Sequence, residues 1–121
     1  MAGAQTVITT INNVTVVSFA SEKLLDPAEV ESAGRELYVL VDQQAQRKIV
    51  VDFSQVKFLS SQMIGVILNL HKKSKAIKGE VVLCGLRPEL RKVFQITNLD
   101  RLLTMVEDEE AALNKLGAGS Y

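Results

Sequence analysis

The chain has 121 residues, of which 47% are hydrophobic and 23% are charged, a composition typical of one globular domain. The 14 Lys and Arg residues balance the 14 Asp and Glu residues, so no long-range field favours DNA or RNA, and we expect no direct nucleic-acid partner. Cys84 and His71 are the only residues of their types, which excludes an intrachain disulfide and the familiar zinc clusters.

The first ten residues lack the basic start and long apolar core of a signal peptide, and no apolar run is long enough to span a membrane. We therefore expect a soluble, cytoplasmic protein without membrane insertion, metal or cofactor. The first elements are two strands rich in β-branched residues, at 7–11 and 14–19. Between them lie Asn12 and Asn13, which tolerate the left-handed turn conformation, so the pattern predicts a β-hairpin.

A helix is predicted next. Asp26 can cap it, Pro27 suits its first position and Glu29 completes an arrangement like a capping box. Apolar residues then recur at helical spacing and predict one buried stripe: Val30, Ala33, Leu37, Leu40 and Val41. Gly34 lies on the same stretch, and we interpret it as a point of close packing.

The segments 48–53 ("KIVVDF") and 80–84 ("EVVLC") are short, β-branched and apolar on both alternating faces, as expected of central strands covered on both sides. The stretch between them, from the serine pair to near Gly79, has the length and composition of a crossover helix, which predicts a β-α-β unit. Beyond it we expect a helix opened by Pro88, an edge strand in "LLTMV", and a terminal helix in "EDEEAALNKL" whose acidic residues 107–110 lie at its positive end. Residues 116–121 are expected to form a loose tail.

Nothing in this pattern resembles an active site. A serine needs a base, and the one histidine lies on the same predicted helix as the serine pair. The glycines fit neither a P-loop nor a dinucleotide fingerprint. Lys72, Lys73, Lys75 and Lys78 form a basic cluster that either contacts an acidic partner or complements the dipole of the helix, and the second interpretation is favoured.

Ser60 and Ser61 fall where the crossover helix begins, and serine is a good N-cap because its oxygen accepts a bond from a free backbone N–H. A cap explains one of the two. The stretch "IVVDFSQVKFLSSQMIGVIL" around them resembles the signature of the sulphate transporter and anti-sigma factor antagonist (STAS) domain family. The resemblance extends over nearly the whole chain, from the opening hairpin and Leu25-Asp26 to "GEVVLCGLRPELRKVFQITNLDRLL".

The resemblance implies an α/β fold with a single STAS-like domain over residues 1–121, built from a mixed four- to five-stranded sheet and about four helices. It places the family's phosphoacceptor on Ser61. It also implies an anti-sigma factor antagonist that is not an enzyme, binds an anti-sigma factor with serine kinase activity and so releases a sigma factor. Phosphorylation would end the binding and a serine phosphatase would restore it. Asp26, Ser60, Gln62 and Met63 are the candidate partner contacts.

The chain departs from the family pattern at three places. Ser60 stands where the family has Asp, Gln62-Met63 replaces a pair of small residues, and the glycine before Leu25-Asp26 is absent. These changes alter charge and bulk beside the acceptor, and two alternatives stay open. The domain could be a constitutive scaffold subunit of a stress-signalling or lipid-transport assembly, with both serines as caps. Met63 could belong to the core.

Overall fold

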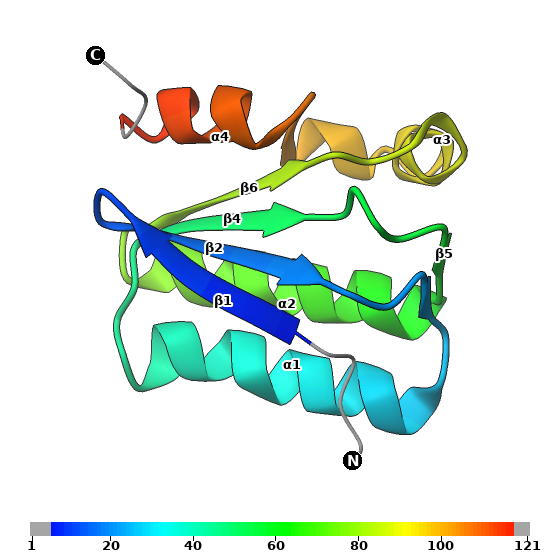
Figure 1. The fold of residues 1–121 in the computed structure, drawn as a ribbon, viewed down its shortest axis with the longest axis horizontal. Coiled ribbons are helices and arrows are strands. Elements are labelled where there is room, and N and C mark those ends of the chain that lie inside the picture. Colours follow the sequence, from blue (N-terminus) through cyan, green and yellow to red (C-terminus); the bar gives the residue numbers. More distant parts are fainter. Residues whose placement is uncertain (1–5, 118–121) are drawn as a thin grey trace.

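The computed structural model describes residues 6–117, and its centre is a five-stranded mixed sheet of order β1-β2-β4-β6-β7 (Figure 1). β1 pairs antiparallel with β2, and the remaining neighbours in the sheet are parallel. The strands of this sheet are β1 (Thr6–Ile11), β2 (Val14–Phe19), β4 (Lys48–Asp52), β6 (Glu80–Cys84) and β7 (Thr104–Val106). The predicted hairpin, β-α-β unit and edge strand are confirmed.

Helices cover both faces of the sheet. In Figure 1, α1 and α2 lie along one face, α4 lies on the other, and α3 lies beyond the carboxyl end of β6. The helical elements are α1 (Pro27–Asp42), α2 (Ser61–Ala76), α3 (Pro88–Ile96), the 3-10 turn η1 (Leu99–Arg101) and α4 (Glu109–Lys115). Because both faces are covered, the central strands bury side chains on both sides, as their apolar sequences predicted.

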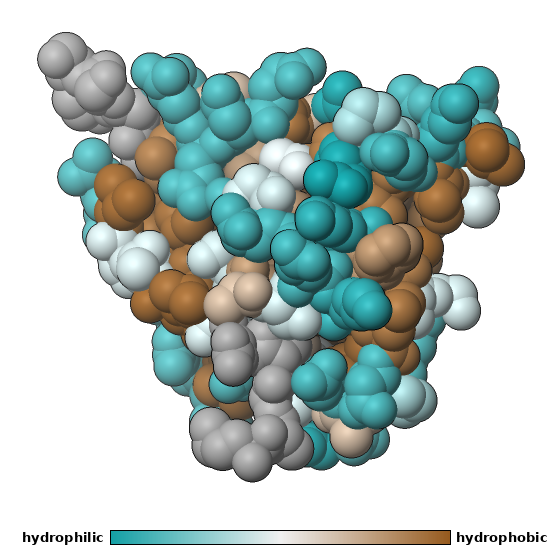
Figure 2. Space-filling view, turned by 45° about the vertical axis from the view of Figure 1, so that its right-hand side comes forward, coloured by the Kyte–Doolittle hydropathy of each residue, from teal (hydrophilic) through white to brown (hydrophobic). Residues whose placement is uncertain are grey.

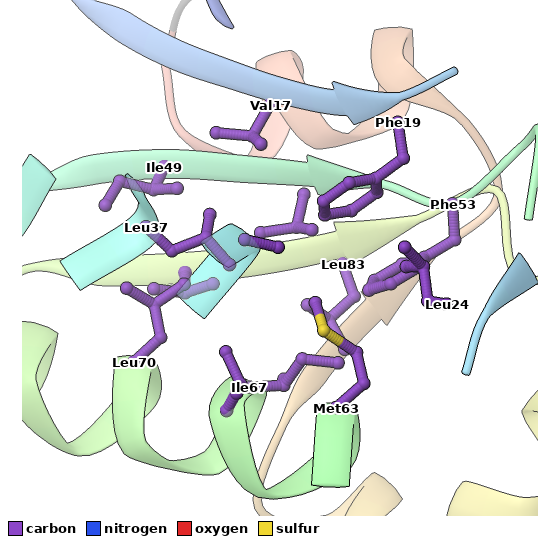
Figure 3. Packing of buried hydrophobic residues seen from close by; sticks show 14 of the residues in the cluster. Val17, Phe19, Leu24, Leu37, Ile49, Phe53, Met63, Ile67, Leu70 and Leu83 are labelled. Carbon is purple, nitrogen blue, oxygen red and sulfur yellow. The ribbon is translucent and has the colours of Figure 1, made fainter. Parts of the chain in front are cut away.

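The larger core lies between the sheet and helices α1 and α2. Alternate residues of the strands, such as Val17, Ile49 and Leu83, point toward these helices, and the stripe predicted for α1 meets them (Figure 3). The intervening residues face α4 and form a second cluster. Gly34 is confirmed as a point of close packing, because a Cβ there would lie 3.2 Å from a methyl group of Val66 on α2.

Local chemistry explains where the elements begin and turn. Asn12 and Asn13 have φ values of 48° and 70°, as the predicted hairpin turn requires. The Asp26 side chain accepts a hydrogen bond from the Glu29 N–H at 3.1 Å, so the predicted cap of α1 is present. Asp108 caps α4 in the same way, and Glu109 and Glu110 occupy its first turn.

The structure corrects two boundaries. Phe53 lies just beyond β4, although it is buried and its N–H donates to the Cys84 carbonyl at 2.9 Å. Leu116 belongs to the smaller core cluster, because the end of α4 packs it against the sheet, so the tail does not begin there. Residues 118–121 of the predicted tail lie outside the described residues. Two short strands, β3 (Lys23–Leu24) and β5 (Phe58–Leu59), form a separate parallel pair that the sequence pattern did not predict.

Between residues 6 and 117, no helix is both long enough and apolar enough to cross a membrane.

Candidate functional site

The chain segments that lead into α1 and α2 are hydrogen-bonded to each other. Leu24 pairs with Leu59 in the small β3–β5 sheet. On either side of this pair, the Lys57 N–H donates to the Glu22 carbonyl at 2.7 Å, and the Ser60 N–H donates to the Leu24 carbonyl at 3.0 Å. The starts of two helices that are far apart in sequence are thereby fixed at one end of the molecule.

The two serines have different environments. Ser60 is the N-cap of α2: its backbone is extended, and its side-chain oxygen accepts a hydrogen bond from the Met63 N–H at 3.1 Å. Ser61 is the first residue of α2 and is exposed. Within residues 6–117, no hydrogen bond holds the Ser61 hydroxyl. The cap interpretation therefore accounts for Ser60 and not for Ser61.

Two of the other predicted contact residues lie on this surface and one does not. Asp26 and Gln62 are exposed, the first at the start of α1 and the second next to Ser61. Met63 is 0% exposed and packs in the larger core, where Figure 3 shows its side chain among those of Leu24, Phe53 and Ile67. The prediction of Met63 as a partner contact is wrong, because the third position of α2 faces the sheet and fills the space at the end of β4.

A hollow of about 330 Å³ lies at the same end of the molecule. Leu25, Phe58 and Leu90 supply much of its apolar lining, and Arg87 and Glu89 at the start of α3 contribute charges. Leu25 and Phe58 are 46% and 51% exposed, and both line this hollow, so they give it an exposed apolar side. Figure 2, which turns this end of the molecule forward, shows hydrophobic and hydrophilic patches side by side. Sequence reasoning treated Leu25 and Phe58 as motif positions and missed the hollow between them.

Serine hydrolase chemistry does not fit this geometry. Ser61 and His71 lie ten residues apart on α2, a separation of about 15 Å along the helix axis. Burial, and then the charge of Lys75, lower the pKa of His71. Within residues 6–117, no group of three or more His, Cys, Asp or Glu side chains could hold a metal ion.

The loop that leads to Ser60 is anchored by a buried carboxylate. Asp52 ends β4, and its Oδ1 accepts a hydrogen bond from the Ser54 N–H at 2.8 Å. The neighbouring Cys84 is buried, and burial followed by the charges of Asp52, Glu109 and Asp108 raises its pKa to about 12. Its thiol is thus protonated and unreactive at neutral pH. Asp52 is a positioning residue that sequence reasoning did not single out.

A carboxyl pair at this anchor predicts a pH-dependent stability. A hydrogen bond to Asp52, then burial and then the charge of Asp52, raise the pKa of Glu109 to about 7. The folded protein binds more protons than the unfolded chain between about pH 4.5 and 7, so the free energy of unfolding falls as pH rises through this range. Glu109→Gln removes that slope. In urea unfolding, its stability relative to the unsubstituted protein should rise by on the order of 1 kcal/mol from pH 5 to pH 8, a value reduced for the partial exposure of Glu109.

Glu110→Gln is the matched control, since Glu110 is exposed on the same first turn and its loss costs the same interaction with the helix dipole. An equal pH response in both variants would contradict the Asp52–Glu109 pair.

The sequence is similar to that of known proteins. The family model described as the STAS domain matches residues 5–112. A protein of Bordetella bronchiseptica that is named as the anti-sigma factor antagonist BtrV is 32% identical over 89 residues, which cover 74% of this chain and 76% of that protein.

Solved structures share the fold. An anti-sigma-factor antagonist (STAS) domain protein from Planctomyces limnophilus has a TM-score of 0.82 at 27% identity, over 96% of this chain and 98% of that chain. The Bacillus cell fate determinant SpoIIAA in its phosphorylated form has a TM-score of 0.72 at 23% identity, over 92% of this chain and 98% of that chain. The second likeness shows the fold alone. The predicted fold class, a mixed sheet of four to five strands with helices, is confirmed.

Proposed function

The chain belongs to the STAS domain family, and from this premise we propose that it is an anti-sigma factor antagonist whose binding is switched by phosphorylation of Ser61. It acts as a cytoplasmic regulator in bacterial stress signalling and not as an enzyme. Unmodified, it binds an anti-sigma factor that has serine kinase activity, and a sigma factor is released. Phosphorylation by that kinase ends the binding, and a serine phosphatase restores it. The observation that carries the proposal is the contrast between two hydroxyls: that of Ser60 caps α2, and that of Ser61 is exposed and has no hydrogen bond to any residue from 6 to 117.

A phosphate at this position changes binding more than stability. It adds about −1.5 to −2 charges at neutral pH, and the first turn of a helix favours negative charge. The domain therefore stays folded after modification. A partner that binds over the start of α2 must instead remove water from this charge, or is repelled by it if its own surface is negative there. Either effect lowers the affinity of the complex. One reaction on an exposed hydroxyl thus controls an interface without a change of fold.

The contact surface we propose surrounds Ser61. Gln62 and Asp26 supply exposed polar groups, and the hollow beside Phe58 and Leu25 can accept an apolar side chain of the partner. The β3–β5 pairing and the Asp52–Ser54 hydrogen bond hold these groups in fixed positions in the free protein. A surface that is already ordered loses less conformational entropy on binding.

The test is the intact mass of the protein purified from its native cells, resting and stressed, with the modified residue located by fragmentation. We expect a phosphate on Ser61 whose occupancy differs between the two conditions, and no phosphate in Ser61→Ala. A phosphate that is found on Ser60 when Ser61 is replaced would show that Ser60, and not Ser61, is the phosphoacceptor.

Serines that are bare in both conditions would overturn the switch and support the alternative function. In that case the domain is a constitutive scaffold subunit of a stress-signalling or lipid-transport assembly. The replacement of the family's Asp by Ser60 supports this alternative, because it removes a charge beside the acceptor position.

A further inference from the structure

A basic hollow lies at the end of the sheet opposite Ser61. Its volume is about 310 Å³, and five cationic side chains and one carboxylate line it. They come from three separate segments: the turn from α1 to β4, the end of α2 with its turn into β6, and the end of α4. The charged lining residues are Arg47, Lys48, Lys75, Lys78, Lys115 and Glu80.

The floor of this hollow is rigid. The Glu80 N–H donates to the Arg47 carbonyl at 2.7 Å, which joins the two turns that enter β4 and β6. Between them, a Cβ at Gly79 would lie 2.7 Å from the Arg47 carbonyl oxygen, so the backbones pack as closely as glycine allows. Lys78 adopts a left-handed backbone conformation with φ of 62°. The cations of the two turns thus project from fixed backbone positions.

In the part of the chain that the structure describes, no salt bridge neutralises any of the five cations. The salt bridges among residues 6–117 involve other basic residues, such as Lys73, which pairs with Asp42 at 2.8 Å. The chain has no net charge, and the acidic segment 107–110 begins α4 while Lys115 ends it. Charge is therefore segregated, and a concave wall with five cations and one carboxylate gives the hollow a net positive field.

Helix dipoles explain only part of this cluster. Lys75 and Lys115 lie in the last turns of α2 and α4, where cations complement the carbonyl ends. Arg47, Lys48 and Lys78 lie outside these helices and still converge on the same space. The interpretation favoured from sequence, that the lysine cluster complements the helix dipole, fits Lys73 and Lys75 in the last turn of α2. It does not account for Lys78 or for the convergence of the other cations on this hollow.

We propose that this hollow binds a phosphate-bearing anion with at least two negative charges. Its volume is at the lower limit of small-molecule sites, which suits a compact polyanion better than a nucleic-acid strand. The ligand is either a soluble phosphorylated molecule or the headgroup of a lipid that carries two phosphates. The site does not depend on modification of Ser61, since the two lie at opposite ends of the strands.

The first experiment is a titration of the full chain with pyrophosphate, followed by amide chemical shifts in NMR at constant ionic strength. We expect saturable shifts confined to residues 47–48, 75–80 and 115–116. Lys78→Gln and Lys115→Gln should each weaken binding about threefold to tenfold, and Glu80→Gln should strengthen it. Lys92→Gln is the matched control, because Lys92 is exposed on α3 at the other end and should leave the affinity unchanged. Shifts that do not saturate, or equal losses in the control, would overturn the proposal.

The second experiment distinguishes the two sources. Phosphatidylcholine vesicles with and without cardiolipin are sedimented with the protein. Pyrophosphate binding without cosedimentation identifies a soluble ligand. Cosedimentation that requires cardiolipin and is lost in the Lys78→Gln, Lys115→Gln double variant identifies a headgroup. The absence of both forms of binding, or cosedimentation that the double variant retains, contradicts the site.

Discussion

Ser61→Glu should weaken binding to the cognate anti-sigma factor about 100-fold while leaving the melting temperature within a degree or two of the unsubstituted protein. The carboxylate places a permanent charge at the exposed first position of α2, where the helix dipole tolerates it and a docked partner does not. A loss of this size is the usual cost of an unpaired charge buried in an interface. Calorimetric titration gives the affinity, and thermal unfolding gives the stability.

Two controls separate charge from size and position. Ser61→Ala should bind normally and resist phosphorylation, since the Ser60 hydroxyl and not that of Ser61 caps the helix. Gln44→Glu adds the same charge at the exposed turn after α1, at the other end of the molecule, and should leave the affinity unchanged. If Ser61→Glu bound as tightly as Ser61→Ala, the partner surface would not include the start of α2.

Most of the fold was predictable because the spacing of apolar residues and the capping residues of helices are local signals. The apolar runs at 48–53 and 80–84 predicted central strands, and the asparagine pair at 12–13 predicted a tight turn with positive φ. Even Gly34 was identified correctly as a packing point. The strands and the turn depend on residues that are near one another in the chain, so the sequence pattern carries the information.

The site was predictable only in part, because its geometry depends on contacts between distant segments. Leu24 and Leu59 each belong to a strand of two residues, which is too short to give a periodic signal, yet the pairing of these strands brings Asp26 toward the serines. Met63 could not be assigned to core or surface from its position, since a residue in the first turn faces either way until the direction of the helix is known. The basic hollow similarly requires three segments that only the topology brings together.

Gly85→Ala should reduce the free energy of unfolding by about 2–4 kcal/mol, the largest effect expected here for a single methyl group. Gly85 has φ of +72°, a left-handed conformation that costs an alanine about 1–2 kcal/mol. The added Cβ would also lie 2.7 Å from the Asp52 Oδ1 and 2.9 Å from the Ser54 nitrogen, so the anchor must shift. The hydrogen bond from the Ser54 N–H to Asp52 holds the loop that leads to Ser60. Partner affinity should therefore fall together with stability. Urea unfolding measures the first effect and calorimetric titration the second.

Gly65→Ala makes the same chemical change with the opposite expected sign. Gly65 lies inside α2, and a Cβ there has no heavy atom within 4 Å, so alanine should raise stability by about 0.5–1 kcal/mol through better helix propensity. Gly65 also lies one turn after Ser61 on the same side of the helix. A partner that packs closely over this surface will meet the new methyl group, so Gly65→Ala should bind more weakly although it is more stable.

If Gly85→Ala unfolded at the same urea concentration as the unsubstituted protein, the close contact between Gly85 and Asp52 would not be what fixes the loop that leads to the serines.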